Sequence, residues 1–306
     1  MQATSKTQCH HQNSLNNLPW FKQAYWFFII IIACSFGVSA QTVQEDQPPF
    51  YKISWQNQHG YLLGSIHVGQ ASFYPMAEQI EQAFLQSDAL VIEADVEQAD
   101  TMALLTQYGK AAPELAAKTS NVTADYCQKV QSFCDAIAPY APWLQAAQIS
   151  MMRFASLGYV ADQGVDVTFA KKRGNKPLLE LESVAFQFEL ISSFSEKTQL
   201  QMVDEAVNAS DADMVELISV WRNGDQQKLA AIMEQQAGEA DELLTKLLWQ
   251  RNHTMSDKML TMMQQHSAQQ LFFIVGAGHV VGQQNIPQLL RQQGATVTDC
   301  WQNSCR

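Results

Sequence analysis

Two of the seven histidines lie in the same short pattern, in which a glycine is followed three residues later by a histidine. One pattern runs from Gly64 to His67, and the other runs from Gly276 to His279. Each follows an apolar run typical of a strand, and open α/β sheets bind their ligands at the carboxyl ends of strands. We therefore expect His67 and His279 to meet in one site. The alternative is two loop histidines without a shared role.

Three glutamates follow predicted strands in the same way. Glu93 comes directly after Ala89–Ile92, a run that is apolar at every position, as in a central strand covered on both faces. Glu180 and Glu182 follow the shorter run Leu178–Leu179, and strand alternation would direct both to the same face. A carboxylate in such a position is either part of a site or a paired structural ion.

The residue types at these strand ends are those of a metal site. Two histidines and a glutamate, here His67, His279 and Glu93, match a common ligand set for divalent transition metals. These three ligands would leave coordination positions of the ion open for water and substrate. Glu180 or Glu182 would then act as a general base or would orient a ligand.

A charged residue, Arg251, interrupts an apolar helical stripe in the second half of the chain. Because arginine is almost never buried without a partner, we expect Glu93, Glu182 or an anionic group of a ligand beside it. Asn252 is adjacent and would reach the same region. The alternative is an arginine that extends along the helix surface to solvent. The apolar members of the stripe are Leu244, Leu248, Met255, Met259 and Met262.

Strand signals gather at the two ends of the chain that follows residue 40. Tyr51–Trp55 and Tyr61–Leu63 flank a polar turn and predict a hairpin. Near the C-terminus, Leu271–Val275, Ile286–Gln293 and Ala295–Thr298 indicate strand, helix and strand, which implies that these two strands pair in parallel.

The predicted fold class is α/β, with a mixed, mainly parallel sheet and a large central helical insertion. We expect one domain over residues 41–306, with helical insertions at about 101–160 and 195–265. Within the first, Tyr126, Val130, Phe133 and Ile137 have the spacing of one helix face. Asp166 is expected to cap the N-terminus of a later short helix.

Composition limits the partners. The chain is 47% hydrophobic and carries a formal net charge of −11 without a basic block, which argues against a nucleic-acid partner. We expect a peptide or a small molecule as the substrate.

Four cysteines beyond the N-terminal segment suggest disulfides in an exported protein. Cys300 and Cys305 lie in a predicted terminal loop, where a disulfide between them would form easily. Cys127 and Cys134 are seven residues apart, and on one straight helix their Cα atoms would lie about 10.5 Å apart, beyond bridging distance. Either the helix breaks between them or they pair elsewhere.

The N-terminus has the features of a removable signal peptide, residues 1–40. Two lysines and no acidic residue precede the apolar run Tyr25–Phe36, and Val38–Ala40 has small or apolar residues suited to signal peptidase. This predicts a periplasmic or secreted protein without a transmembrane anchor in its mature form. The alternatives are an uncleaved anchor and a lipoprotein attached through Cys34, which follows a lipobox-like segment.

Seven segments of the chain carry a family resemblance. They are Tyr61–Gly69, Leu90–Glu93, Gly164–Asp166, Lys176–Ser183 with Gln187, Trp221–Asp225, Arg251-Asn252 with Met255, and Val275–His279. Together they resemble the TraB/PrgY/GumN family, which includes the Tiki proteases, and the resemblance covers nearly all of residues 50–300 in order. One departure is Gln250, which stands where the family usually has glutamate and removes a possible charge partner of Arg251.

The resemblance implies a fold related to erythromycin-esterase-like and ChaN-like proteins, with the site at the two glycine–histidine patterns. Tiki-type members are metal-dependent proteases that favour manganese or cobalt, and other members are linked to shutting down peptide signals. The resemblance therefore implies a peptidase-like hydrolase.

Three functions compete. In the first, a metal-dependent hydrolase, His67, Glu93 and His279 hold manganese, cobalt or zinc, while Arg251 and Asn252 hold a substrate carboxylate or the developing oxyanion. The second is a metal-free hydrolase in which a histidine oriented by Glu93 is the base. The third is a non-catalytic protein that binds a peptide or small ligand. Metal binding separates the first from the others, and turnover separates the second from the third.

We predict that the mature chain begins at Gln41, because Val38-Ser39-Ala40 follows the apolar run. N-terminal sequencing of exported protein checks this. A lipid-modified start at Cys34 would contradict it and support the lipoprotein alternative.

Overall fold

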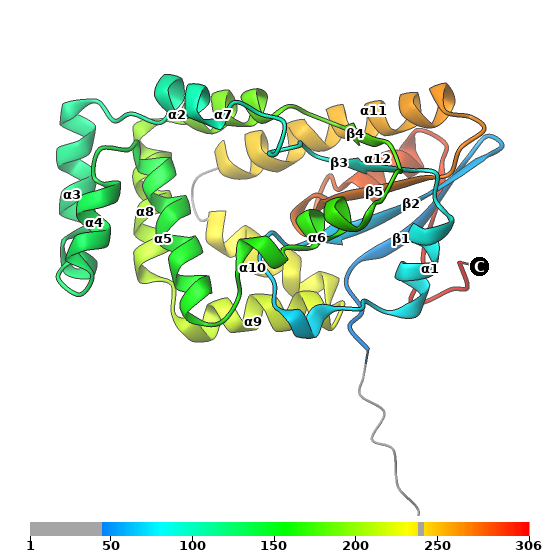
Figure 1. The fold of residues 1–306 in the computed structure, drawn as a ribbon, viewed down its shortest axis with the longest axis horizontal. Coiled ribbons are helices and arrows are strands. Elements are labelled where there is room, and N and C mark those ends of the chain that lie inside the picture. The colour runs from blue at the N-terminus through cyan, green and yellow to red at the C-terminus, as the bar shows by residue number, and fades with distance from the viewer. Residues whose placement is uncertain (1–44, 238–241, 306) are drawn as a thin grey trace, which may run out of the picture. The chain divides into compact units, whose positions relative to one another are not determined.

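The computed structural model describes residues 45–237 and 242–305, in which six strands form one mixed sheet (Figure 1). The order of the strands is β4-β3-β5-β2-β1-β6. Their bounds are Phe50–Trp55 for β1, Gln58–Ser65 for β2, Ala89–Ile92 for β3, Leu178–Glu180 for β4, Leu271–Gly276 for β5 and Thr296–Asp299 for β6.

Four neighbouring strands, β4, β3, β5 and β2, run parallel, whereas β1 pairs antiparallel with both β2 and β6. All four residues of β3 and five of the six in β5 are buried, which explains why these runs lack polar alternation. The predicted mainly parallel sheet, built from the two ends of the chain, is confirmed. Because the four strands share one direction, their carboxyl ends lie at one edge.

Aromatic packing holds two helices against the centre of the sheet. Phe272 of β5 stacks on Phe169 of α6 (Val165–Lys172) with ring centroids 5.8 Å apart. Phe84 of α1 (Glu78–Gln86) meets Phe272 edge-on at 5.5 Å. These contacts fix the helix that follows the first glycine–histidine pattern and the helix that carries Asp166.

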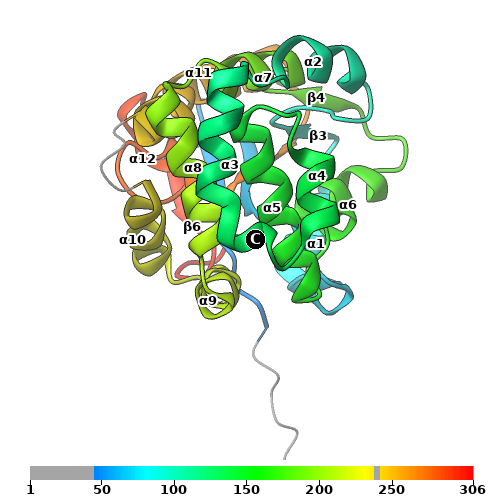
Figure 2. The same cartoon turned by 90° about the vertical axis from the view of Figure 1, so that its left-hand side faces the viewer.

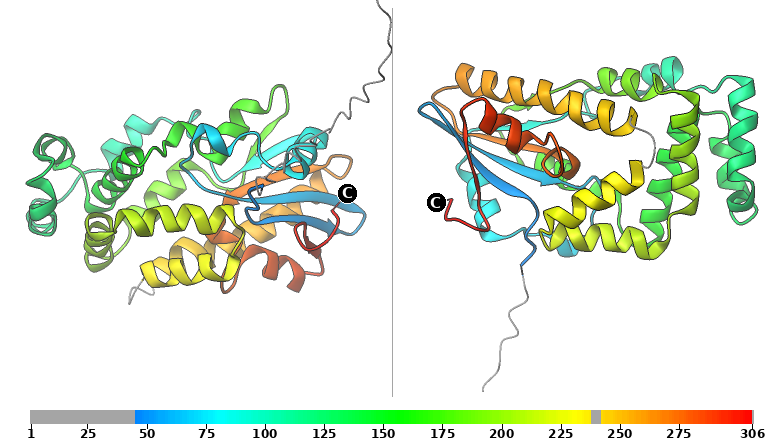
Figure 3. Two further views of the ribbon diagram at one scale, coloured as in Figure 1. Left: turned by 90° about the horizontal axis from the view of Figure 1, so that it is seen from below. Right: turned by 180° about the vertical axis from the view of Figure 1, so that it is seen from behind.

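Helix α11 (Gln250–Gln265) contacts β2 and the neighbouring α12 (Ile286–Gln292), the orange and red helices in the right-hand view of Figure 3. Met255, Met259 and Met263 are buried along it. The predicted stripe therefore ends on Met263 rather than on Met262, because the spacing of four continues to the end of the helix.

The middle of the chain is helical, as predicted. Helices α3, α4, α5 and α8 lie side by side (Figure 2), and α5 packs against α8. The bounds are Thr101–Tyr108 for α2, Pro113–Cys127 for α3, Gln131–Ile137 for α4, Pro142–Ser156 for α5, Val184–Ser192 for α7, Glu196–Asn208 for α8, Asp211–Arg222 for α9, Gln226–Ala237 for α10 and Leu243–Trp249 for the π-helix η3.

The continuous helix expected from Tyr126 to Ile137 is wrong. The chain turns at residues 128–130, between α3 and α4. The turn brings the Cα atoms of Cys127 and Cys134 to 5.7 Å, and the two form a disulfide. Of the two possibilities that the sequence left open, the helix break is the one that occurs.

The expected parallel pairing of the last two strands is also wrong. β6 pairs antiparallel with β1, with Lys52 opposite Thr298. Both edges of β5 are already occupied, by β2 on one side and β3 on the other. Strand β6, which follows α12, therefore joins the sheet at the free edge of β1.

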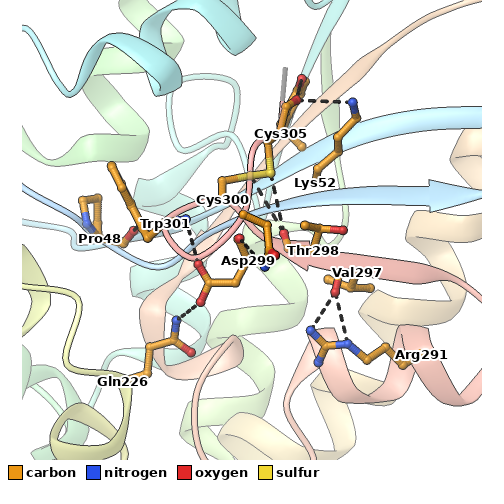
Figure 4. Close-up of a disulfide and its surroundings, with 12 residues drawn as sticks. Pro48, Lys52, Gln226, Arg291, Val297, Thr298, Asp299, Cys300, Trp301 and Cys305 are labelled. Atoms are coloured by element: carbon orange, nitrogen blue, oxygen red, sulfur yellow. Dashed lines mark hydrogen bonds between the residues drawn. A yellow bond between two sulfur atoms is a disulfide. The ribbon is translucent and has the colours of Figure 1, made fainter.

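The second disulfide, Cys300–Cys305, closes the C-terminal loop (Figure 4), and the predicted pairing is confirmed. The loop is tied to the hairpin on both sides. The backbone N–H of Cys300 donates to the Phe50 carbonyl at 3.0 Å, and the Cys305 carbonyl accepts from Lys52 at 3.3 Å and from the Tyr61 hydroxyl at 3.0 Å.

Two disulfides are typical of proteins that fold in an oxidising compartment. Within the described ranges, no helix combines the length and the apolar character needed to cross a membrane. The predicted signal peptide, residues 1–40, lies outside the described residues.

We predict that a digest of the unreduced protein gives two separate local cross-links, Cys127–Cys134 and Cys300–Cys305. Peptide mapping by mass spectrometry, with and without reductant, makes the measurement. A cross-link between the two pairs, or four free thiols in exported protein, would contradict this assignment.

Candidate functional site

The parallel strands deliver the predicted site residues to one edge of the sheet. His67 lies two residues beyond β2, Glu93 directly follows β3, and His279 ends the short 3-10 turn η4 (Ala277–His279) after β5. Backbone pairing continues past β3 and β4, because the N–H of Glu182 donates to the Glu93 carbonyl at 2.7 Å. The two glutamates therefore start from adjacent backbone positions.

His67, Glu93 and His279 surround one point beside Gly276. A Cβ atom at this glycine would lie 3.3 Å from Glu93 Oε1, 3.6 Å from His67 Nε2 and 3.7 Å from His279 Cδ2. The Nε2 atom of His279 lies 3.6 Å from Glu93 Oε1. The structure brings the three predicted residues together, and glycine at position 276 leaves the space between their side chains open.

Asp166 orients His67. Its Oδ1 lies 3.1 Å from His67 Nδ1, so Nδ1 carries a proton and Nε2 is turned toward Glu93. The expectation that Asp166 caps a helix is wrong. Helix α6 already begins at Val165, so Gly164 is its N-cap and Asp166 lies in its first turn. The charge of Asp166 raises the pKa of His67 to about 9, although the imidazole is well exposed.

Asn252 orients His279, which is buried. The amide Nδ2 of Asn252 donates to the Gln284 carbonyl at 2.9 Å, so its Oδ1 is the acceptor that faces His279 Nδ1 at 2.6 Å. The proton of a neutral His279 therefore lies on Nδ1, and Nε2 presents a lone pair toward Glu93. Burial lowers the pKa of His279 to about 4.

Glu93 is held by three donors. Its Oε1 accepts from the backbone N–H of Gly276 at 2.6 Å, and its Oε2 accepts from Arg251 at 2.7 Å and from Gln187 at 3.2 Å. Burial opposes its ionisation, but His279 and Arg251 outweigh burial and lower the pKa of Glu93 to about 2. The carboxylate is therefore charged throughout the neutral range.

Arg251 is buried between two carboxylates, as predicted. Its Nε and Nη2 donate to Glu182 at 2.9 and 2.8 Å, in addition to the bond to Glu93. Its Nη1 donates to the Leu247 carbonyl of η3 at 2.9 Å. Burial alone would lower the pKa of Arg251, but the two glutamates raise it above its usual value. As placed, the guanidinium is engaged with the protein on every nitrogen.

Of the two other predicted glutamates, one joins the cluster and one does not. Glu182 belongs to the cluster through Arg251, and Gln187 bridges it to Glu93 with bonds of 3.0 and 3.2 Å. Glu180 does not join them, because its carboxylate accepts from the backbone N–H of Asp95 at 2.6 Å. Sequence reasoning assigned no site role to Asp166 or Gln187, although both fall in segments that carry the family resemblance.

Comparison with known proteins identifies the family of this chain. A sequence model described as the TraB/PrgY/gumN family matches residues 49–299. The chain belongs to the TraB/PrgY/gumN family. The match begins one residue before β1 and ends with the last residue of β6, so it covers the whole sheet and every residue of the cluster.

Two curated proteins from this comparison carry the name "Uncharacterized protein YbaP", one from Shigella flexneri and one from Escherichia coli strain K12. Each is 25% identical to this family member over 241 residues, which covers 77% of this chain and 89% of the relative. No solved structure matches the chain. The comparisons establish the family and no activity.

In this TraB/PrgY/gumN chain, the cluster forms the polar side of a cavity of about 280 Å³. His67, Glu93, Arg251 and His279 line it together with Ser65 and the glycine-rich turn after β5. The other walls are apolar and come from α9, α10 and η3. A small group bound there would contact charged or polar side chains on one side and hydrocarbon on the other.

The donors fit a divalent ion in type. Each histidine has Nδ1 held by a side-chain oxygen, a common support of metal-bound imidazoles, and space is open beside Gly276. Metal bonds to nitrogen and oxygen are ~2.0–2.2 Å, shorter than the present separations. Among the described residues, no three His, Cys, Asp or Glu side chains are arranged to hold an ion as they stand. Binding would require them to move closer.

We predict that Arg251→Ala lowers the free energy of unfolding by about 3–5 kcal/mol, because it leaves Glu93 and Glu182 buried without their cation. Chemical denaturation of both proteins at neutral pH makes the measurement. Lys118→Ala, which removes an exposed ion pair with Glu196, is the control and should leave unfolding nearly unchanged. Equal stability of Arg251→Ala and the parent would show that the buried cation is not required.

Proposed function

We propose that this chain is a hydrolase of peptide substrates whose reaction centre is the cluster of His67, Glu93 and His279, with a divalent ion as the group these donors hold. One observation carries the proposal. Both imidazoles are oriented through Nδ1 while their Nε2 atoms face one carboxylate at the polar side of a cavity. Such convergence at a strand edge is typical of a reaction centre.

A bound manganese, cobalt or zinc ion would acidify a water molecule and polarise the scissile carbonyl. The residues of the chain hold this centre in place. Asp166 and Asn252 fix the imidazole rings, and Arg251 balances the charges of Glu93 and Glu182. The apolar walls would contact hydrocarbon groups of a bound peptide.

The roles first expected for Glu182, Arg251 and Asn252 change within this proposal. Each makes protein contacts that orient another member of the cluster, which supports positioning roles rather than contact with a substrate anion. Glu180 is not included, since its carboxylate faces the backbone of Asp95.

A second candidate is a metal-free hydrolase. The observation that favours it is the opposite shift of two neighbouring imidazoles, because the pKa of His67 rises to about 9 while that of His279 falls to about 4. At neutral pH the pair would supply one protonated acid and one unprotonated base, a combination used in acid–base catalysis.

Export forms part of the proposal. Two disulfides support a periplasmic or secreted location, where a peptidase-like enzyme would meet peptides outside the cytoplasm. A lipoprotein anchored through Cys34 is the alternative.

We predict that His67→Ala and His279→Ala each abolish metal retention and peptide cleavage, because each removes one of the proposed donors. The measurements are the metal content of purified protein by mass spectrometry and the cleavage of a mixed peptide library with added manganese, cobalt or zinc. His266→Ala is the matched control, since this half-buried histidine bonds only to Gln269 among the described contacts of its ring.

The outcomes separate the candidates. Cleavage that persists after chelation and dialysis, but is lost in both histidine variants, would replace the metal-dependent proposal with the metal-free one. Peptide binding without cleavage under any of these conditions would leave a non-catalytic binding protein and would contradict both hydrolase candidates.

A further inference from the structure

The segment Trp221–Asp225 carries the family resemblance, but none of its residues belongs to the cluster of His67, Glu93 and His279. Its first residue, Trp221, lies near the end of α9 and is 1% exposed. The indole Nε1 of Trp221 donates to the Gly64 carbonyl at 2.9 Å. Because Gly64 begins the first glycine–histidine pattern, this bond reaches the backbone that leads to His67.

The proline at position 49 explains why the Gly64 carbonyl needs a side-chain donor. The antiparallel register of β1 and β2 pairs Phe50 with Leu63. It continues to Pro49 and Gly64, because the Gly64 N–H donates to the Pro49 carbonyl at 2.8 Å. Such a pair normally exchanges two hydrogen bonds, but proline has no N–H to donate. The indole of Trp221 supplies the missing donor.

Gly64 lies where the turns of the two glycine–histidine patterns meet. A Cβ atom at this position would lie 2.7 Å from Val280 Cγ2 and 3.3 Å from the Cα atom of Ala277. Ala277 belongs to the second pattern, and Val280 directly follows it. The two turns are therefore in close contact, and a movement of the Gly64 backbone would reach both histidines.

Helix α6 holds the other end of the first turn. The Val165 N–H donates to the Ile66 carbonyl at 3.0 Å. Gly164 packs so closely on the turn that a Cβ atom there would lie 2.7 Å from the His67 carbonyl oxygen. The backbone that carries His67 is thus fixed at its end by α6 and at its start by Trp221.

Trp221 is itself held in place by the segment that precedes β1. The next residue, Arg222, pairs through Nε with Asp46 at 2.8 Å, and its carbonyl accepts from the Gln47 N–H. Phe73 packs against the indole, with ring centroids 5.5 Å apart. The same indole forms part of the wall of the cavity beside the cluster. The position of the N–H donor is therefore set by contacts on several sides.

We propose that Trp221 is a positioning residue of the reaction centre, which fixes the Gly64–His67 turn by donating to the carbonyl that Pro49 cannot serve. This inference rests on the function proposed above, because it takes His67 as a member of that centre. Trp221 acts through the backbone, and its N–H is engaged by the protein. Loss of this one bond should therefore lower turnover more than substrate affinity.

The first test removes the N–H and keeps an aromatic wall. Trp221 is replaced by benzothienylalanine, in which sulfur stands in place of the indole N–H, and Trp221→Phe is the second variant. Amide exchange in the peptide that contains Gly64 and Ser65, measured by mass spectrometry, should become about tenfold faster, as expected for one lost buried hydrogen bond. With the most rapidly cleaved peptide of the mixed library, kcat should fall by about tenfold and KM should stay within about twofold.

The second test restores the missing donor from the strand. Pro49→Ala adds an N–H opposite the Gly64 carbonyl, so the double variant Trp221→Phe/Pro49→Ala should regain slow exchange and most of kcat.

Trp143→Phe is the matched control, because this buried indole also donates to a backbone carbonyl, that of Tyr108 at 3.4 Å in the helical part of the chain. It should lower the thermal unfolding midpoint and change neither the exchange at Gly64 nor kcat.

The results can overturn the inference separately from the proposed function. Unchanged exchange at Gly64 in both Trp221 variants would show that the indole does not position the turn. An equal fall of kcat in Trp143→Phe, or no recovery with Pro49→Ala, would assign the effect to general stability and overturn the inference as well. A parent protein that cleaves no peptide would reject the hydrolase function, whereas the exchange rates would still decide whether Trp221 holds the turn.

Discussion

The site depends on one buried charge. Arg251 lies between Glu93 and Glu182 and bonds to both, so two carboxylates that would be costly to bury alone are held ionised beside the two histidines. The same guanidinium joins α11 to the ends of β3 and β4. Without this cation the strand ends would repel one another, and the open space at Gly276 would lose the anion that faces both imidazoles.

The parallel part of the sheet makes this cluster possible. Strands β2, β3 and β5 come from distant parts of the chain, yet each ends at the same edge and delivers one polar residue there. The long helical segments between them supply the outer support. Asp166 reaches His67 from α6, and Asn252 reaches His279 from α11. Two parts of the structure therefore position each histidine. The end of a strand places its backbone, and a side chain from a helix holds its Nδ1 atom.

The sequence alone predicts the parts that follow from local patterns. Apolar runs before His67, Glu93 and His279 identify strand ends, and a charge in an apolar stripe identifies a buried arginine. Which side chains or strands pair with one another does not follow from local sequence patterns. Asp166 has the sequence context of a helix cap, and only the tertiary position of α6 turns it toward His67. β6 likewise follows a strand–helix pattern that suggests pairing with β5, while the occupancy of both β5 edges is a property of the whole sheet.

Leu247 takes part in two structures at once. Its carbonyl accepts a hydrogen bond from Arg251, and the residue lines both the cavity beside the cluster and a cavity of about 370 Å³ bounded by α5 and α8. The turn of π-helix that carries it therefore sets both the direction of the guanidinium and the shape of the space for a ligand. A shift of the η3 backbone would therefore move both, whereas a change of the Leu247 side chain alone would reshape the cavity and leave this hydrogen bond in place.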